Sequence, residues 1–418
     1  MNIWILNHYA GSIEFGMESR HYYFAKELIS MGHNVTIIVG SYSHLRKKNL
    51  EIKKMQEEWH EGIRFIWIPT CVYTGNGLGR IKSMLDYYLN AVAAAKKLAS
   101  PDVILSSSPH PLACLAGIQI AKNKKCMCVS EVRDLWPEAL VYYKGLSDRS
   151  PIVKVLEYYE HKIYKNSDTL IFTKPGDVDY LKEKGWLTSK GGDVADSKCY
   201  YINNGVDLKN FIKQIDACVF EGMEDNGADK FVVTYVGTIR EVNNIDMLLD
   251  AAKQLKQYPD IEFRIFGDGE ELDRLKQRKT DEQIDNVIFY GRVEKQFIPN
   301  ILSKSSVNIL NYSPTMYNWT RGNSSNKLFE YMACGRPVIS TVTMGYSPIV
   351  AYNCGVEIAD CNGEKLAEAI ERLKKADHNV LCEMGENAAQ AAKDFDYPIL
   401  AEKLISVLNN TIRGENDD

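Results

Sequence analysis

Apolar stretches and amphipathic stretches alternate along this chain, in the order typical of a parallel sheet covered by helices. The apolar run Ile3–Leu6 is followed by an amphipathic segment, Ser19–Met31, and then by a second apolar run, Val35–Val39. A strand, a helix and a strand in this order form a unit with parallel strands and a right-handed connection. Amphipathic helices are expected again at 364–375 and 397–410. The pattern therefore predicts an α/β fold.

The same periodicities predict the elements between these ends. Strands are expected at 102–105, 126–129, 169–173, 231–237, 286–290 and 307–310. Helices are expected at 42–58, 80–99, 112–122, 150–165, 243–257 and 271–278. The polar segment 208–229 is expected to be a linker.

Length and composition narrow the class of protein. A chain of 418 residues exceeds a single usual core, so two domains are expected. Apolar residues make up 45% and charged residues 25%, which are ordinary values for a globular protein. No apolar run reaches the length of about 18 residues that a membrane-spanning helix needs. The ten cysteines are scattered without a Cys-X-X-Cys pair, which favours a reducing cytoplasm and argues against a zinc site.

Charge is distributed unevenly along the chain. Residues 1–200 contain 26 Lys and Arg against 21 Asp and Glu, whereas the remainder contains 24 against 34. A basic first half suits an anionic membrane or a phosphate-bearing acceptor, although an excess this small also fits an ordinary surface. The net charge is −5, and no nucleic-acid partner is expected.

The segment 323–341 carries the clearest chemical signal. Its polar start, Asn323–Asn326, consists of helix-capping residues, and an apolar helix pattern follows up to a stop signal at Gly335. A helix N-terminus presents backbone N–H groups and a partial positive charge, which suit a phosphate, and Lys327 adds a full charge there. Glu330 follows one turn later, where a carboxylate can accept hydrogen bonds from a sugar diol. The alternative is a capped helix with a solvated Lys–Glu face.

Ser324–Glu330 resembles the donor-site signature of the retaining nucleotide-sugar glycosyltransferases of family four. In that family, a Glu at the position of Glu330 binds the nucleotide ribose. A further Glu expected eight positions upstream is replaced here by Gly322. The sequence Ser-Ser-Asn-Lys-Leu-Phe-Glu is similar to the variant found in one branch, the N-acetyl-L-fucosamine transferases of bacterial surface-polysaccharide assembly.

The segment Glu131–Glu138, Glu-Val-Arg-Asp-Leu-Trp-Pro-Glu, resembles the same branch. It follows a predicted strand, and charged residues at the carboxyl end of a strand are expected where ligands bind an open α/β sheet. Many family members have a His at the position of Arg133, close to the transferred sugar. Because Arg cannot act as a base, Arg133 is expected to bind charge or hydroxyls, and Asp134 to orient it or to accept from a sugar hydroxyl. The alternative is a buried Arg–Asp pair.

Further motifs of the family follow in the same order. Asn203–Asp207 resembles the segment that closes the first domain, and Phe266–Glu270 resembles a strand-end turn of the second. The loop Gly11–Glu18 resembles the family's Gly-Gly-X-Glu loop, with Phe15 in place of the first Gly. Gly16 is therefore the expected point of close approach to a donor phosphate.

The resemblance implies a GT-B fold, in which two Rossmann-like domains with parallel sheets face each other across a cleft. It implies an acceptor-binding domain at 1–207 and a nucleotide-sugar-binding domain at 208–394, with a C-terminal helix at 395–412 packed back on the first. The candidate catalytic residues are Arg133, Asp134, Lys327, Arg240 and Glu18. The candidate donor-binding residues are Gly16, Gly237, Arg240, Gly267, Gly269, Arg292, Ser324, Ser325, Asn326, Lys327, Leu328 and Glu330.

The reaction implied is transfer of a sugar, with retention, from a nucleoside diphosphate to a hydroxyl. A UDP-linked sugar, in particular an N-acetylated amino sugar, is the expected donor. Arg240, Lys327 and the helix start at Ser324–Asn326 would stabilise charge on the leaving diphosphate in place of a metal, so no metal or other cofactor is expected. Two other functions remain open, a nucleotide-sugar epimerase of the same fold and a catalytically silent glycosyltransferase-like subunit.

The segment 80–99 holds candidate contacts for the acceptor or a membrane. Apolar residues recur there at helical spacing, at Ile81, Met84, Leu85, Tyr88, Val92 and Ala95, with basic residues at both ends. This pattern suits an interfacial helix, although a helix packed on its own domain also shows it. The candidate acceptor or membrane residues are Arg80, Lys82, His110, Lys96 and Lys97.

The resemblance also implies an acceptor and a location. The acceptor would be a polyprenyl-diphosphate-linked saccharide in O-antigen or capsule assembly. The enzyme would be cytoplasmic and peripherally associated with the inner face of the bacterial plasma membrane.

Overall fold

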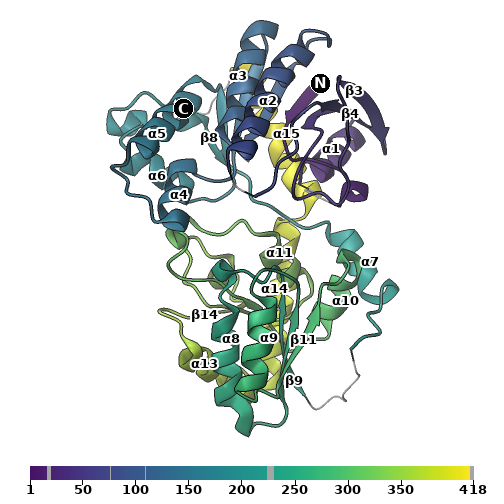
Figure 1. Ribbon diagram of the computed structural model, residues 1–418, viewed down its shortest axis with the longest axis vertical. Helices are drawn as coiled ribbons and strands as arrows, with labels where there is room; N and C mark the ends of the chain where they lie inside the picture. Colours follow the sequence, from purple (N-terminus) through teal and green to yellow (C-terminus); the bar gives the residue numbers. More distant parts are fainter. Residues whose placement is uncertain (17–19, 76, 109, 224–229, 415–418) are drawn as a thin grey trace. The chain divides into compact units, whose positions relative to one another are not determined.

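Two structural units make up the chain, and each is built around its own β-sheet (Figure 1). The structure is a computed structural model that describes residues 1–16, 20–75, 77–108, 110–223 and 230–414. Unit 1 comprises residues 1–203 and the C-terminal segment from Tyr397 onward, and unit 2 comprises Asn204–Asp396. The chain therefore passes between the units twice, at Asn203–Asn204 and at Asp396–Tyr397.

Unit 1 holds an eight-stranded sheet in the order β3-β4-β2-β1-β5-β6-β7-β8. Its strands are β1 (Asn2–Leu6), β2 (Asn34–Gly40), β3 (Gln56–His60), β4 (Ile63–Ile68), β5 (Val103–Ser108), β6 (Met127–Val132), β7 (Thr169–Phe172) and β8 (Cys199–Tyr201). Neighbouring strands run parallel, except that β3 pairs antiparallel with β4 at one edge. Glu61 and Gly62 connect β3 to β4 with φ of 46° and 80°, as in a type I′ hairpin turn.

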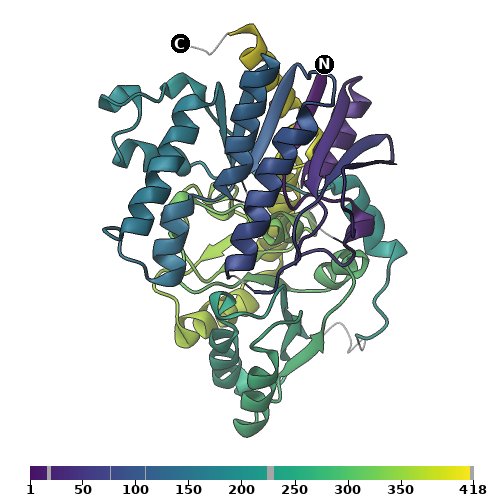
Figure 2. The ribbon, with the colours of Figure 1, turned by 45° about the horizontal axis from the view of Figure 1, so that its top comes forward.

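Helices cover both faces of this sheet (Figure 2). The helices of unit 1 are α1 (Arg20–Ser30), α2 (Leu78–Ala95), α3 (Pro111–Lys124), α4 (Trp136–Lys144), α5 (Pro151–Asn166), α6 (Asp177–Glu183) and α15 (Tyr397–Arg413). Ile3 and Ile5 of β1 pack with α1 and α15, whereas Trp4 and Leu6 pack with α2 and α3. Because successive strand residues point to opposite faces and both faces are covered, the four residues Ile3–Leu6 of this central strand are all apolar.

Unit 2 holds a six-stranded parallel sheet in the order β11-β10-β9-β12-β13-β14. Its strands are β9 (Phe231–Val236), β10 (Ile261–Phe266), β11 (Val287–Gly291), β12 (Val307–Leu310), β13 (Val338–Ser340) and β14 (Gly355–Glu357). Its helices are α7 (Leu208–Ala217), α8 (Ile245–Gln254), α9 (Leu272–Asp281), α10 (Ile298–Ser303), α11 (Asn326–Ala333), α12 (Pro348–Ala351), α13 (Gly363–Lys375) and α14 (His378–Asp394). Tyr235 packs with α8 and α13, and Val236 packs with α11 and α14. Both units are thus Rossmann-like, and the predicted fold class is confirmed.

The helix predicted at 42–58 is wrong, because part of this charged segment is buried. Gln56–His60 forms the edge strand β3, and the residues before it form turns. The guanidinium of Arg46 is buried and donates hydrogen bonds to the carbonyl oxygens of His8, Ala10 and Gly40. Arg46 therefore ties this segment to the ends of β1 and β2 instead of lying on a solvated helical face.

Four helices of unit 2, α7, α10, α12 and α14, were not predicted. Helix α7 replaces most of the described part of the expected linker, and Asp207 caps it by accepting a hydrogen bond from the backbone N–H of Asn210. Helix α14 buries small residues, Gly385, Ala388, Ala391 and Ala392, whose hydrophobic signal is weak. These small residues let α14 pack closely against the turn that follows α11. A Cβ on Gly385 would lie 2.4 Å from the carbonyl oxygen of Gly335 in that turn.

Unit 1 buries a carboxyl group, Glu160 of α5, between two phenols. The hydroxyls of Tyr164 and Tyr180 donate to its two carboxylate oxygens, each at 2.7 Å. Burial raises the pKa of Glu160 to about 7, although these hydrogen bonds favour its charged form.

We expect Glu160→Gln to change how the stability of the protein depends on pH. Between pH 4.5 and about 7, the carboxyl of Glu160 keeps its proton in the folded state, whereas the unfolded chain releases it. The free energy of unfolding therefore decreases as pH rises through this range. The midpoint of thermal unfolding of the wild type should therefore fall more steeply between acidic and neutral pH than that of the variant. Equal slopes for the two proteins would contradict the raised pKa.

Candidate functional site

A pocket of about 620 Å³ lies at the carboxyl ends of β9, β10 and β11 in unit 2. It is lined by Val236, Gly237, Thr238, Phe266, Gly267, Asp268, Gly269, Arg292, Val293 and Ile298. The strand order reverses beside β9, which has β10 on one side and β12 on the other. Ligands of open α/β sheets bind at the carboxyl ends of strands next to such a reversal. The predicted donor-binding residues Gly237, Gly267, Gly269 and Arg292 therefore meet in one pocket.

The glycines of this pocket let two strand-end turns pack directly on each other. Gly267 has a φ of +147°, and a Cβ there would lie 1.8 Å from the carbonyl oxygen of Gly237. A Cβ on Gly269 would lie 2.1 Å from the carbonyl oxygen of Ile239. A larger residue at either position would force the turns apart, so both glycines are needed for the shape of the pocket.

Lys327 reaches from the first turn of α11 to the turn after β9. A Cβ on Gly237 would lie 2.9 Å from Cδ and 3.1 Å from Nζ of Lys327, so the lysine lies against this glycine. Its ammonium lies 4.9 Å from the ring centre of Tyr235 and 4.6 Å from that of Tyr312. No carboxylate among the described residues forms an ion pair with Lys327. Two aromatic faces therefore hold this cation without neutralising it.

Polar atoms at the start of α11 lack partners. Ser325 is the N-cap residue, but its side chain makes no capping hydrogen bond. Its hydroxyl and the Oδ1 atom of Asn326 are buried, and neither has a hydrogen-bond partner within the described ranges. Buried polar atoms are nearly always hydrogen-bonded, and a helix N-terminus also leaves backbone N–H groups unpaired. The start of α11 is therefore arranged for a polar ligand, and an anion suits it best.

Arg240 adds a second cation to the turn that follows β9. It is exposed, it precedes the short helix Glu241–Asn243, and none of the described carboxylates pairs with it. Burial raises the pKa of Tyr235 well above its ordinary value, and the charge of Arg240 opposes this shift. Asn311, which follows β12, holds this loop by donating to the carbonyl oxygens of Asn243 and Asn244.

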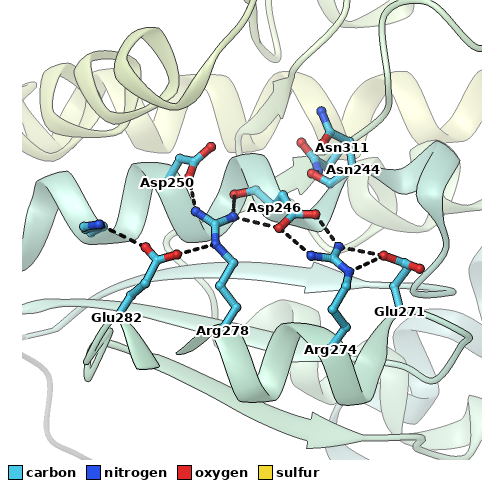
Figure 3. A network of polar contacts seen from close by, with 9 residues as sticks. Asn244, Asp246, Asp250, Glu271, Arg274, Arg278, Glu282 and Asn311 are labelled. Atoms are coloured by element: carbon cyan, nitrogen blue, oxygen red, sulfur yellow. Dashed lines mark hydrogen bonds and ion pairs between the residues drawn. The ribbon is translucent and has the colours of Figure 1, made fainter. Parts of the chain in front are cut away.

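Two other arginines of unit 2, Arg274 and Arg278, form ion pairs with carboxylates (Figure 3). Arg274 pairs with Asp246 and Glu271, and Arg278 pairs with Asp246, Asp250 and Glu282. Their charges are thus neutralised on the outer side of α8 and α9. Arg292, which lines the pocket, is exposed and has no ion pair with a described carboxylate. The unneutralised cations Lys327, Arg240 and Arg292 therefore gather at or near the pocket, where an anionic ligand would be favoured.

Glu330 lies one turn after Lys327, as predicted. Its side chain is 16% exposed, and its Oε1 atom lies 3.6 Å from the ammonium of the exposed Lys295. Gly322, at the position of the missing upstream Glu, has a φ of +96°. A residue with a side chain would be strained in this conformation, so the departure from the family signature goes together with a different local backbone.

Two of the predicted donor-binding residues, Leu328 and Ser324, have structural roles at the start of α11. The side chain of Leu328 is fully buried in the apolar core, because its position faces inward on α11, so this side chain is not available to a ligand. Ser324 contributes its carbonyl oxygen to the fold by accepting a hydrogen bond from the Asn204 amide.

The corresponding strand reversal of unit 1 holds a buried pair of histidines. β1 lies between β2 and β5, and His8 and His110 follow β1 and β5. Nδ1 of His8 and Nε2 of His110 are 2.9 Å apart, and both rings are fully buried. Burial, helped by the charge of Arg80, lowers the pKa of His110 to about 3. His110 is thus a neutral, buried side chain rather than an exposed loop contact.

Arg133 and Asp134 follow the end of β6, at the carboxyl edge of the same sheet. The backbone N–H of Arg133 donates to the hydroxyl of Ser108 at 3.3 Å. Asp134 is 58% exposed and lies 3.9 Å from the buried ammonium of Lys174. The alternative of a buried Arg–Asp pair does not hold, because Asp134 faces solvent.

Glu131, the first residue of the same motif, belongs to the core. Its carboxylate accepts hydrogen bonds from Arg20, His21 and Ser107 at 2.7–2.8 Å, and it is 1% exposed. Burial alone would raise the pKa of Glu131, but the charges and hydrogen bonds of Arg20 and His21 bring it well below its ordinary value. Glu131 therefore has a structural role that the sequence motif did not reveal.

The loop after β1 contains two further predicted residues. Gly16 has a φ of +66°, and the side chain of Lys47 packs against it, since a Cβ on Gly16 would lie 2.6 Å from Cγ of Lys47. Glu18 lies outside the described residues.

Helix α2 buries one apolar face and exposes another. Met84, Tyr87, Ala91 and Ala94 pack inward, whereas Leu78, Ile81, Leu85 and Leu89 are 46–84% exposed. Lys82, Lys96 and Lys97 are also exposed. The guanidinium of Arg80, a further candidate acceptor or membrane contact, lies 5.8 Å from the ring centre of Tyr9. Across the described residues, no helix is long and apolar enough to cross a membrane.

The chain has two Asp-X-Asp sequences, a pattern that can hold a divalent metal. Asp177 is fully buried beside Lys174, and Asp179 pairs with Lys182. Asp394 accepts from the Tyr352 hydroxyl, and Asp396 accepts from the backbone N–H of Leu208. Within the described ranges, no group of three His, Cys, Asp or Glu residues could hold a metal ion.

Two glycosyltransferase family models match the chain in succession. The model described as Glycosyltransferase Family 4 matches residues 16–210, and the model described as Glycosyl transferases group 1 matches residues 221–394. Together they span most of both units.

Curated relatives of the chain are also named as glycosyltransferases. An uncharacterized glycosyltransferase of Methanocaldococcus jannaschii is 25% identical over 206 residues, which are 47% of this chain and 54% of the relative. The Bacillus subtilis glycosyltransferase TuaH, named for teichuronic acid biosynthesis, is 25% identical over 221 residues, which are 51% of this chain and 50% of the relative. The chain thus spans about half the length of the curated relatives it matches.

Solved structures resemble the whole chain. Sucrose-phosphate synthase from Thermosynechococcus elongatus covers 99% of both chains, at 18% identity and a TM-score of 0.74. HepE from Anabaena, solved in complex with UDP and glucose, covers 98% of this chain and 100% of its own, at 17% identity and a TM-score of 0.66. These likenesses show that the chain has the GT-B fold, and the two family models show that both of its units resemble glycosyltransferase domains.

Proposed function

We propose that this glycosyltransferase moves a sugar from a nucleoside diphosphate, with UDP as the nucleotide, to a lipid-diphosphate-linked saccharide. The observation that carries the donor assignment is the pocket of unit 2, with Lys327, Arg240 and Arg292 unneutralised at or near it. A diphosphate is the anion that such a set of cations and a helix N-terminus suits. HepE, which has the same fold, was solved with UDP.

The proposed reaction proceeds with retention on the front face of the sugar. The bond between the sugar C1 and the diphosphate oxygen breaks, and a bond forms between C1 and the acceptor hydroxyl. The hydroxyl proton passes to an oxygen of the departing diphosphate. Lys327, Arg240 and the start of α11 stabilise the negative charge that develops on this leaving group. Glu330 accepts hydrogen bonds from the ribose hydroxyls.

In this proposal Arg133 and Asp134 act on the sugar and the acceptor. Arg133 binds charge or hydroxyls, and Asp134, which is exposed, accepts from a sugar hydroxyl. Cationic side chains take the place of a metal ion at the diphosphate. Transfer is therefore expected to continue in EDTA, and restoration by Mg²⁺ or Mn²⁺ of an activity lost in EDTA would contradict this assignment.

The acceptor assignment rests on the motif Glu131–Glu138 and the segment Ser324–Glu330, which resemble the N-acetyl-L-fucosamine transferase branch. A relative named for teichuronic acid biosynthesis supports a role in surface-polysaccharide assembly. An acetamido sugar in O-antigen or capsule assembly is the specific form of this proposal.

Incubation with a panel of nucleotide sugars and lipid-diphosphate acceptors tests the function. We expect UDP release that depends on acceptor, together with a glycosylated lipid. An isomerised nucleotide sugar without glycosylated lipid would indicate an epimerase. Binding of UDP without any turnover on the panel would favour a catalytically silent subunit.

Membrane contact through α2 is part of the proposal. The exposed residues Leu78, Ile81, Leu85 and Leu89 are spaced to lie on one side of the helix. Lys82 and Lys96 follow Leu78 and Leu89 at helical spacings of four and seven, so they fall on this side. An apolar stripe flanked by lysines suits an interface with anionic lipid.

We expect Lys82, Lys96 and Lys97, all changed to Glu, to weaken binding to anionic vesicles. Each lysine near such a surface contributes about 1 kcal/mol, and salt should release the wild type. Co-sedimentation with anionic and neutral vesicles at low and high salt measures the effect. The matched control changes the exposed Lys276, Lys365 and Lys375 of unit 2 to Glu. Equal loss in both variants would reject α2 as the docking surface.

A further inference from the structure

A buried lysine connects the carboxyl ends of β6 and β7 in unit 1. Lys174 follows β7, and its side chain is 2% exposed. Its ammonium donates to the carbonyl oxygen of Arg133 at 2.9 Å. It also lies 3.5 Å from Oδ2 of Asp177 and 3.9 Å from Oδ1 of Asp134. Lys174 thus touches the backbone of Arg133 and the side chain of Asp134 at the same time.

The backbone of Arg133 is held from both neighbouring strands. On the β5 side, the Arg133 N–H donates to the hydroxyl of Ser108. On the β7 side, the Arg133 carbonyl accepts from the hydroxyl of Thr173 at 3.2 Å and from Lys174. The position of the chain just after β6 therefore depends on these contacts.

We propose that Lys174 is a positioning residue for sugar transfer, which acts by fixing Arg133 and Asp134 at the end of β6. This inference rests on the proposed function, in which Arg133 and Asp134 act on the sugar and the acceptor. Positioning matters because a displacement of about 1 Å at a reacting centre can cost about 10²-fold in rate.

A purely stabilising role does not account for the burial of this pair. Replacing a buried ion pair by apolar residues of similar volume is often neutral or stabilising. Asp177 is fully buried, and burial raises its pKa to about 7 even though Lys174 favours its charged form. The carboxylate oxygens of Asp177 have no hydrogen-bond partner among the described residues. The Lys174–Asp177 pair is therefore a weak source of stability, and its ammonium is directed at Arg133 and Asp134.

The experiment compares the double variant Lys174→Met/Asp177→Leu with the wild type. This variant removes both buried charges together, so that neither is left unpaired. Three quantities are measured: kcat of transfer, affinity for UDP and the midpoint of thermal unfolding. The expected result is a kcat lower by about tenfold or more, with UDP affinity and unfolding midpoint close to those of the wild type.

Lys198 provides a matched control in the same unit. It is also a buried lysine that donates to backbone carbonyls, those of Lys165 and Ser167, each at 3.0 Å. It precedes β8, so it lies at the amino edge of the sheet, away from Arg133. Lys198→Met is expected to change stability without changing kcat.

A second pair of variants covers the case in which the double variant does not fold. The amide of Lys174→Gln can still donate to the Arg133 carbonyl, whereas Lys174→Met cannot. We expect Lys174→Gln to retain clearly more transfer than Lys174→Met. A wild-type kcat in a folded double variant, or equal kcat in the Gln and Met variants, would overturn the inference. Failure of the wild type to bind UDP or transfer sugar would instead overturn the proposed function.

Discussion

Lys327→Ala is expected to slow sugar transfer by about 10²–10³-fold, as loss of a single oxyanion donor does in other enzymes. Lys327 is the cation at the start of α11, and the rings of Tyr235 and Tyr312 hold it in place. An ammonium that no described carboxylate neutralises can act fully on a departing diphosphate. Steady-state kinetics with the preferred donor measures the loss, which should fall mainly on kcat because the charge develops as the bond breaks.

Lys253→Ala is a suitable control, since Lys253 pairs with Glu282 on the outer side of unit 2 and should not contribute to transfer. Lys327→Arg keeps the charge and should be less impaired than Lys327→Ala. Activity of Lys327→Ala within a few-fold of the wild type would mean that Arg240 and the start of α11 are sufficient to stabilise the leaving group.

Glu131→Gln is expected to destabilise the protein by about 3–5 kcal/mol, the cost of breaking a buried ion pair. Glu131 accepts from Arg20, His21 and Ser107, and its partners are all donors. The amide of Asn7 is oriented by the N–H of Tyr9, so it donates to Nδ1 of His21 and leaves Nε2 as the donor to Glu131. A glutamine cannot accept with both ends, and Arg20 would lose its buried counter-charge.

Denaturant unfolding of wild type and variant measures this effect. The control is Glu57→Gln, which breaks a Glu–Arg pair of the same unit in which Arg64 and Glu57 are 29% and 41% exposed. An exposed pair contributes at most about 1 kcal/mol. Similar losses of unfolding free energy in the two variants would show that the buried ion pair of Glu131 contributes no more to stability than the exposed pair of Glu57.

Strong periodicity was sufficient to predict most of the fold. The apolar strands at the centre of each sheet and the long amphipathic helices are visible in sequence, because burial on a sheet or along a helix face imposes a regular spacing. The prediction of a helix at 42–58 was wrong because a charged side chain, Arg46, is buried there. Its hydrogen bonds to carbonyl oxygens cannot be recognised from the spacing of apolar residues. Helix α14 was missed because its buried residues are Gly and Ala.

The candidate site of unit 2 could be located in part from the sequence, because its residues follow strand ends and a helix start. Gly237, Gly267 and Arg292 come from turns far apart in sequence, and the rule that ligands bind at the carboxyl ends of parallel strands joins them. The same rule would have drawn attention to Lys174, which directly follows a predicted strand. The contacts of Lys327 with Tyr235 and Tyr312 could not be predicted, because they depend on side-chain packing between three segments. Glu131 was grouped with Arg133 in one motif, although the last residues of β6 point into the core and Asp134 points to solvent.

Calorimetric titration of UDP into the wild-type protein measures directly whether the pocket of unit 2 holds a nucleoside diphosphate. We expect one binding site per chain and a clearly lower affinity in Lys327→Ala, since the ammonium of Lys327 contacts the diphosphate in the proposed site. A GDP titration distinguishes a preference for uracil from recognition of the diphosphate alone. Absence of binding by both nucleotides up to about millimolar concentration would contradict the claim that the pocket of unit 2 holds a nucleoside diphosphate.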